Sequence, residues 1–273
     1  MASLSPLLRS YDQVILDLDG SVWVGDEPTP GAAEAIAALR EAGKRIAFVT
    51  NDARHAEEDF VTKLWRLGVQ ASLADVVTAA GATQSLLHDT RPGRTAFVIG
   101  TAAMLAHVSD AGLSVLNGTE RSAHAEVVVV AGNDDLTYDD LKQAVLALGR
   151  GADLLATSRD ATYPMPDGLW PGTGAILAAI ELASGRTAEI VGKPEPGLFM
   201  TALDRLGPGR TLVVGDRLDA DVAAAASAGI DAALVLTGGT SKAEAATAMG
   251  ADGSDRPRPI AVAESLAALV WGS

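Results

Sequence analysis

The alternation of short apolar runs with longer helical segments is the feature that most constrains the fold of this chain. The runs are apolar throughout, as in strands that are buried on both faces of a parallel sheet. They lie at Val14–Leu16, Ile46–Val49, Ile190–Val191, Leu212–Val214 and Ala233–Leu236. Helical patterns such as Ala32–Ala42 and Leu198–Leu206 separate them, and each ends just before a glycine, a common helix stop. The alternation predicts a doubly wound α/β fold with a parallel sheet.

A second, smaller α/β domain is predicted as an insertion into the first. The alternation continues through the middle of the chain, at Ala96–Ile99 and Val127–Val130 for example, but few polar groups follow these runs. Small residues near Ala79–Thr83 and Ser184–Thr187 would let the chain bend between the domains. A length of 273 residues also fits two domains. The expected division is core domain 1–81, inserted domain 82–184 and core domain 185–273.

The composition excludes several classes of function. Acidic residues outnumber Lys and Arg by 35 to 21, a net charge of −14, which disfavours binding to nucleic acid or to anionic membranes. Cysteine is absent, so disulfides, thiolate catalysis and cysteine zinc sites are excluded. The apolar runs are far shorter than the roughly 20 residues of a membrane span, and the first ten residues lack the apolar stretch of an export signal. We expect a cytoplasmic protein with neither nucleic acid nor membrane as partner.

Polar clusters follow the predicted core strands, at the sheet edge where α/β proteins bind ligands. The first is Asp17-Leu18-Asp19-Gly20, directly after an apolar strand. An ordinary acidic turn is the alternative interpretation. Asp17, however, would be a partly buried carboxylate, and such a group needs a partner.

Two further clusters carry groups that suit an anion. Thr50 and Asn51 offer a hydroxyl and an amide to phosphate oxygens, although a helix cap or an Asx turn is the preferred interpretation of this cluster taken alone. Lys193 follows a predicted buried strand, and Pro194 restricts its backbone to extended conformations, which limits where the ammonium can point. A solvated loop lysine is the alternative.

The fourth cluster suits a cation. Asp216 stands at the tip of a strand and Asp221 about one helical turn later, so both carboxylates could face one metal ion. Acidic residues at a helix start also stabilise it by roughly 0.3–1 kcal/mol each. Stabilisation of the helix start is a sufficient explanation for Asp219.

Together the four clusters resemble, in order, the motifs of the haloacid dehalogenase superfamily. The segments DLDGSVWVG, FVTND, VGKPEP and GDRLDADV are similar to subfamily IIA, which includes NagD-like, p-nitrophenyl phosphatase-like, phosphoglycolate and glycerol-phosphate phosphatases. The insertion resembles the α/β cap of type C2. The resemblance therefore implies a Rossmann-like core with a C2-type cap domain.

The resemblance also implies a role for each matched residue. Asp17 would be the nucleophile that forms an aspartyl-phosphate, and Asp19 the general acid and base whose backbone carbonyl also binds metal. Thr50 and Asn51 would bind the phosphoryl group, and Lys193 would act in catalysis by pairing with the nucleophile and with the phosphate charge. The expected Mg²⁺ ligands are Asp17, Asp19, Asp216 and Asp221.

Electrostatic repulsion among the clustered acids independently indicates that cations are needed at this site. Two carboxylates 4 Å apart repel by roughly 4 kcal/mol at an effective dielectric of 20, so a phosphate dianion cannot approach four of them unaided. Lys193 supplies one positive charge, and a divalent ion supplies two. Oxygen ligands with a phosphate co-ligand favour Mg²⁺ over zinc.

The expected function is Mg²⁺-dependent hydrolysis of small phosphate monoesters, such as glycerol 3-phosphate, 2-phosphoglycolate, sugar phosphates or p-nitrophenyl phosphate. The expected partner is thus a small phosphorylated metabolite, and the resemblance adds a homodimer formed through the cap. A phosphotransferase or mutase with the same nucleophile is one alternative. A non-catalytic module that binds phosphometabolites is another, although it would be expected to lack Asp17 or Asp19.

Three departures from the family pattern bear on substrate choice. Asp52 stands where the motif has a second asparagine, and an extra acid there could disfavour anionic leaving groups. In the insertion, Ser158 and Arg159 depart from a substrate-facing loop that commonly reads TNPD. We expect Arg159, Asp160 and Tyr163 to close over the leaving group, with a plain surface loop as the alternative.

Overall fold

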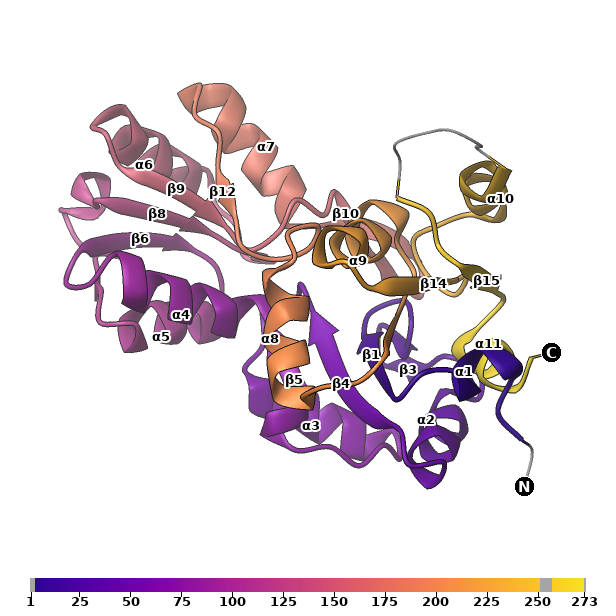
Figure 1. Ribbon diagram of the computed structural model, residues 1–273. Helices are drawn as coiled ribbons and strands as arrows, with labels where there is room; N and C mark the ends of the chain where they lie inside the picture. Colours follow the sequence, from indigo (N-terminus) through magenta and orange to yellow (C-terminus); the bar gives the residue numbers. More distant parts are fainter. Residues whose placement is uncertain (1–2, 251–256, 273) are drawn as a thin grey trace.

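The computed structural model describes residues 3–250 and 257–272, and its larger sheet forms the core domain. Six parallel strands make this sheet, with β1 next to its centre (Figure 1). Their order is β15 (Ala261–Ala263), β14 (Asp231–Val235), β13 (Thr211–Gly215), β1 (Gln13–Asp17), β4 (Arg45–Thr50) and β5 (Val76–Thr78). The chain leaves β1 toward one edge of the sheet and later returns to the other, which creates a topological switch point at the end of β1.

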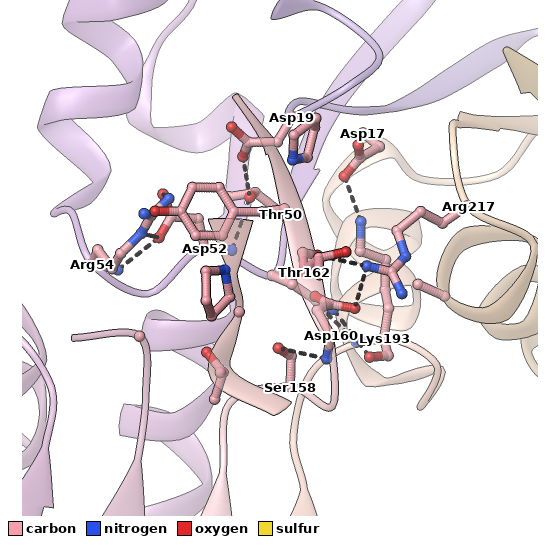
Figure 2. A pocket seen from close by; sticks show the side chains of 18 of the residues that line it. Asp17, Asp19, Thr50, Asp52, Arg54, Ser158, Asp160, Thr162, Lys193 and Arg217 are labelled. Atoms are coloured by element: carbon pink, nitrogen blue, oxygen red, sulfur yellow. Dashed lines mark hydrogen bonds and ion pairs between the residues drawn. The ribbon is translucent and has the colours of Figure 1, made fainter. Parts of the chain in front are cut away.

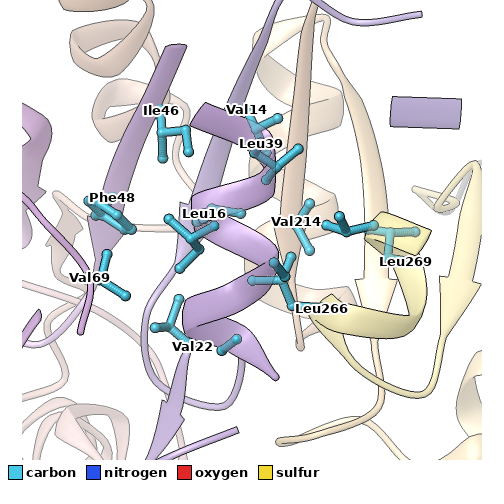
Figure 3. Packing of buried hydrophobic residues seen from close by; sticks show 14 of the residues in the cluster. Val14, Leu16, Val22, Leu39, Ile46, Phe48, Val69, Val214, Leu266 and Leu269 are labelled. Carbon is cyan, nitrogen blue, oxygen red and sulfur yellow. The ribbon is translucent and has the colours of Figure 1, made fainter. Parts of the chain in front are cut away.

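Helices cover both faces of the core sheet. One face packs on α1 (Pro6–Arg9), α2 (Ala32–Glu41), α3 (Glu57–Arg66) and α11 (Leu266–Trp271). The other face packs on α8 (Gly197–Leu206), α9 (Ala223–Ala228) and α10 (Lys242–Gly250). Alternate residues of β1 serve the two faces: Val14 and Leu16 lie with Leu39 of α2 (Figure 3), whereas Ile15 faces the other side. Burial on both faces explains why the strand is apolar without alternation.

A second parallel sheet forms the inserted domain. Its order is β12 (Glu189–Ile190), β9 (Asp153–Ala156), β8 (Val127–Val130), β6 (Thr95–Ile99) and β7 (Ser114–Val115). Helices α4 (Ala79–Thr90) and α5 (Ala102–Asp110) cover one face, and α6 (Tyr138–Gly149) and α7 (Thr173–Ser184) the other (Figure 1). The structure thus confirms the expected α/β core with an α/β insertion.

Two short hairpins and three single turns complete the described elements. The hairpin of β2 (Trp23–Val24) and β3 (Glu27–Pro28) follows β1, and that of β10 (Thr162–Met165) and β11 (Gly168–Pro171) belongs to the insertion. The turns are 3₁₀ turns at Leu73–Asp75 and Ser122–His124 and a π-helical turn at Leu218–Val222. In the residues that the structure describes, no helix is long and apolar enough to span a bilayer.

The joins between the domains differ from the expected ones. Helix α4 begins at Ala79, where a bend was expected, because Ala80 and Leu87 pack against Met104 of α5. The run at Ile190 is not a core strand, because it pairs with β9 in the second sheet. We therefore propose that the insertion spans residues 79–190, and we refer to these residues as the cap.

A partly buried ion pair ties the cap to the core beside the first join. His107 of α5 lies 3.3 Å from Glu57 of α3, measured from Nε2 to Oε2, and its Nδ1 lies 2.7 Å from Oε1 of Gln84. Both ring nitrogens face acceptors, so the geometry favours the doubly protonated, charged ring. Hydrogen bonding to Glu57 raises the pKa of His107. Burial opposes ionisation of Glu57, but His107 and Thr78 outweigh it and lower its pKa to about 2.

Replacing His107 with alanine is expected to lower the free energy of unfolding by about 1.5–3 kcal/mol at pH 6, the usual value of a charged hydrogen bond. Because the folded pKa of His107 lies above its unfolded value, this stabilisation is complete below about pH 6.5 and is lost as the pH rises through the folded pKa. Glu57 stays ionised throughout this window, and Glu58 and Asp110 also favour the charged ring. Urea denaturation of both proteins between pH 5.5 and 9 measures the difference. The exposed His88 of α4 provides the control variant, H88A, and a difference for H107A that does not shrink with pH would contradict the pair.

Candidate active site

The strand order brings the four sequence clusters to one cavity at the carboxyl ends of the core strands. Asp17 ends β1, and the neighbouring strands β13 and β4 end beside Asp216 and at Thr50. Lys193 arrives from the loop after β12. All four line a cavity of about 90 Å³ between core and cap. The predicted residues therefore converge although they lie far apart in the chain.

Lys193 is the cation that the buried Asp17 requires. Its ammonium lies 2.5 Å from Oδ1 of Asp17 and 2.7 Å from Oδ1 of Asp221 (Figure 2 shows the first contact). All three side chains are at most 6% exposed. Burial alone would lower the pKa of Lys193, but the two carboxylates outweigh it and raise the pKa. The lysine is therefore held charged.

Three buried carboxylates fit a hard divalent cation. Oxygen atoms of Asp17, Asp216 and Asp221 all lie within 4.8 Å of one another. Burial and the neighbouring acids raise the pKa of Asp17 and bring that of Asp216 to about 7. One lysine cannot balance three carboxylates, and an all-oxygen set of this kind suits Mg²⁺. These three side chains are the ones that would hold the ion.

Glycines at this edge let the backbone approach the carboxylates. A Cβ atom on Gly20, where φ is +87°, would lie 2.4 Å from an oxygen of Asp216, and one on Gly238 would lie 2.0 Å from it. A Cβ atom on Gly215 would lie 2.2 Å from Cγ of Asp221. No side chain fits at these distances, so the glycines of the DGS and GD sequences are steric requirements of the acidic cluster.

Asp19 is held apart from the three clustered carboxylates. Its Oδ1 accepts a hydrogen bond of 2.8 Å from the Trp23 indole, and its Oδ2 accepts one of 3.3 Å from the Thr50 hydroxyl. Burial and the charge of Asp52 raise the pKa of Asp19. The carboxyl is thus free to carry a proton. Its expected part in metal binding, through the backbone carbonyl, stays a prediction.

The side chain of Asn51, which was expected to contact phosphate, bonds to other residues of the protein. Its Oδ1 accepts the Lys193 backbone N–H at 2.8 Å, and its Nδ2 donates to the Lys193 carbonyl at 3.0 Å and to Asp160 at 2.8 Å. The side-chain amide is therefore occupied by protein partners. Asn51 positions Lys193 and joins its loop to the cap.

Comparisons with known proteins identify the family. Residues 14–114 match the profile of the haloacid dehalogenase-like hydrolases, and residues 190–269 match a second HAD-hydrolase-like profile. An acid sugar phosphatase of Staphylococcus aureus is 31% identical over 85% of this chain and 88% of its own length. The chain belongs to the haloacid dehalogenase-like hydrolases.

Further relatives agree with this membership. A D-glycerol 3-phosphate phosphatase of Mycobacterium tuberculosis is 36% identical over 86% of this chain, although the match spans only 65% of that protein. The structure of a glycerol phosphate phosphatase from the same species, in complex with magnesium, superposes with a TM-score of 0.85 at 34% identity over 98% of this chain and 78% of that one. NagD from Escherichia coli superposes with a TM-score of 0.79 at 28% identity over 94% and 98% of the two chains. The expected family is thus confirmed, and the relatives named here include phosphatases of glycerol phosphate and of sugars, one of them solved with magnesium.

Two of the three cap residues predicted for this hydrolase line the cavity, and one does not. Asp160 and Tyr163 belong to the lining. Arg159 is exposed and pairs with Glu181 of α7 through both terminal nitrogens, at 2.9 and 2.7 Å, so it points away from the cavity. The N-terminus of α7 packs so closely on this loop that a Cβ on Gly174 would lie 2.3 Å from the Arg159 carbonyl. The arginine side chain on this closely packed loop points outward, to Glu181.

Two arginines of the hydrolase line the cavity without having been predicted. Arg217 donates to the carbonyl of Thr162 in β10 at 2.9 Å and lies 3.6 Å from Asp160, so it joins the core to the cap hairpin. Arg54 lies with its guanidinium 4.1 Å from the centre of the Tyr163 ring. Both side chains contact the cap, and the spacing of residues in the sequence does not predict such contacts.

Adding Mg²⁺ is expected to stabilise the hydrolase strongly, because the ion neutralises the buried carboxylates only in the folded state. At a hundredfold excess over its dissociation constant the gain is about 2.7 kcal/mol, or roughly 5–10 °C in Tm. Thermal unfolding with Mg²⁺ and with EDTA measures this shift. Asp216→Asn should lose most of it, whereas Asp219→Asn should retain it because that side chain is 74% exposed. Equal shifts in the two variants would contradict the assigned metal ligands.

Proposed function

We propose that this hydrolase cleaves small-molecule phosphate monoesters through an aspartyl-phosphate on Asp17, with Mg²⁺ as cofactor. The observation that carries the proposal is the placement of Asp17. It shares a buried cluster with Asp216, Asp221 and Lys193, while Asp19 stands separately two residues away. One carboxylate can thus act as nucleophile while the other moves a proton.

In the first step a carboxylate oxygen of Asp17 attacks phosphorus and the bond from phosphorus to the ester oxygen breaks. Asp19 donates a proton to that oxygen, which leaves as an alcohol. Lys193 and Asn51 keep the nucleophile and its counter-charge in position. When bound, Mg²⁺ would supply the positive charge that lets the phosphate dianion approach the carboxylates.

In the second step the carboxylate of Asp19 takes a proton from water, and the water oxygen attacks phosphorus. The bond between Asp17 and phosphorus breaks, inorganic phosphate leaves and both carboxyl groups return to their starting state. Thr50 is 1% exposed and its hydroxyl donates to Asp19 at 3.3 Å, and in this proposal the hydroxyl turns to a phosphoryl oxygen when the substrate binds.

The size of the cavity supports small substrates. Its volume is about 90 Å³, and Arg217 bonds to the cap hairpin beside it. We propose the class of substrates that the relatives' names indicate, namely glycerol phosphate and sugar phosphates, together with 2-phosphoglycolate and p-nitrophenyl phosphate.

Release of inorganic phosphate from these esters, with Mg²⁺ and with EDTA, tests the proposal. Magnesium-dependent release from at least one of them is expected. Transfer of the phosphoryl group to a second sugar without release of phosphate would instead show a phosphotransferase or mutase. Binding without turnover would show a phosphometabolite-binding module.

A further inference from the structure

The wall of the cavity beside Asp19 is formed by a closed ion pair between Asp52 and Arg54. Nε of Arg54 lies 2.9 Å from Oδ1 of Asp52, and its Nη2 lies 3.1 Å from Oδ2. The Arg54 backbone N–H also donates to Asp52, and His55 lies 3.1 Å from it. The side chains are only 16% and 9% exposed. Such a two-point pair is rigid, and it occupies one whole edge of the guanidinium.

This pair lies beside Asp19, the residue proposed to protonate the leaving group. Asp19, which protonates the leaving oxygen, shares Thr50 with Asp52: the Thr50 hydroxyl donates to Asp19 and accepts the Asp52 N–H at 3.0 Å. In Figure 2, Asp52 and Arg54 lie across the pocket from Lys193 and Arg217. A leaving group that takes its proton from Asp19 would therefore face Asp52, Arg54 and the Tyr163 ring that packs on Arg54.

The charges around the cavity leave no cation for a second anionic group. Its lining includes seven aspartates and three basic side chains. Each basic side chain already has a carboxylate within ion-pair distance: Lys193 has Asp17, Arg54 has Asp52 and Arg217 has Asp219. Asp134 of the cap adds another carboxylate, whose Oδ1 lies 3.9 Å from Nη1 of Arg54. A carboxylate on the leaving group would thus meet an excess of negative charge and find the Nε–Nη2 edge of Arg54 already taken by Asp52.

We propose that Asp52, by occupying Arg54, makes the site select leaving groups that are neutral and hydroxylated, as in polyols and sugars, over leaving groups that carry a carboxylate. The inference rests on the proposed function and narrows its substrate class. Asp52 acts as a positioning residue through Arg54, and the pair determines specificity. Removing the carboxylate frees a guanidinium that can then accept a carboxylate of the substrate in the same two-point manner.

The test compares glycerol 3-phosphate, whose leaving group is neutral, with 2-phosphoglycolate, whose leaving group carries a carboxylate. The quantity measured is the ratio of kcat/KM for 2-phosphoglycolate to that for glycerol 3-phosphate, because effects of a substitution on Asp19 act on both substrates and cancel. The wild-type ratio is expected to lie below about 0.1. Asp52→Asn should raise it at least tenfold, and an unchanged ratio overturns the proposal.

Two further variants show whether a change in this ratio comes from freeing Arg54 or from the change in net charge. Asp134→Asn removes one negative charge from the same cavity without freeing the guanidinium, so its ratio should change less than about threefold. The double variant D52N/R54Q should return to the wild-type ratio. A shift in D134N as large as that in D52N, or a gain that persists in the double variant, overturns the role of Arg54.

The wild-type protein keeps the test decisive if Asp52→Asn does not fold. A wild-type preference for 2-phosphoglycolate overturns the inference without any variant. The failure of the proposed function is a separate result, because then neither these esters nor p-nitrophenyl phosphate would release phosphate with Mg²⁺. Turnover of p-nitrophenyl phosphate with the wrong ratio contradicts only the inference.

Discussion

Replacing Asp17 with asparagine is expected to lower turnover by at least about 10⁴-fold, the scale on which loss of a nucleophile acts in enzymes with covalent intermediates. The introduced amide cannot form the aspartyl-phosphate, and none of the neighbouring groups that the structure describes can replace the lost carboxylate. Asp216 and Asp221 are turned toward the metal position, and Asp19 is bonded to Trp23 and Thr50. At saturating Mg²⁺ the effect belongs mainly in kcat, because Lys193 and Thr50 remain to hold the phosphate, and Asp216 and Asp221 remain to hold the ion.

Steady-state release of phosphate and acid-quench trapping of a phosphorylated protein measure the two parts of this result. The wild type should accumulate a phosphoenzyme that is labile in base, and D17N should form none. Asp12, which immediately precedes β1 at the opposite end of the same strand, provides the matched control D12N. Turnover of D17N within tenfold of the wild type would exclude the nucleophile role.

The core of the site could be predicted because strand ends are a local property of the sequence. The apolar run before Asp17 implies a buried strand, and a carboxylate at its tip implies a cation nearby. The prediction reached Lys193 as well, although the strand before it was assigned to the wrong sheet. Edge strand β12 of the cap sheet leads into the loop that returns to the core, so Lys193 enters the same cavity.

The cap side of the site could not be predicted in the same way, because it depends on which loops meet across the two domains. Asp52 was recognised as a departure from the family motif, but its partner Arg54 was not, since a spacing of two residues in a loop does not imply contact. The direction of Arg159 depends on how closely α7 packs on its loop, around Gly172 and Gly174. Arg217 lies within a recognised motif, yet its guanidinium donates a hydrogen bond to the carbonyl of Thr162, which is distant in the sequence.

Replacing Lys193 with methionine is expected to destabilise the protein as well as inactivate it. Removing one partner of a buried ion pair costs about 3–5 kcal/mol, and here a single ammonium serves two carboxylates, Asp17 and Asp221. Turnover should fall by about 10³-fold or more, because the positive charge that faces the transferring phosphoryl group is lost. Urea denaturation and steady-state kinetics measure the two effects.

The loss of stability in K193M should depend on both metal and pH, which distinguishes lost charge from lost packing. Mg²⁺ binds only the folded cluster and restores positive charge there, so the difference from the wild type should be larger in EDTA than in Mg²⁺. In EDTA the folded pKa of Asp17 lies above its unfolded value even with the lysine present. The charge of Asp17 therefore destabilises the folded protein fully above the folded pKa. This loss of stability disappears as the pH falls below about 4, the pKa of the unfolded aspartate. The exposed Lys142 of α6 supplies the control K142M, which should show neither dependence. A K193M penalty that stays constant from pH 4 to 8, with or without Mg²⁺, would mean that the lysine contributes packing alone.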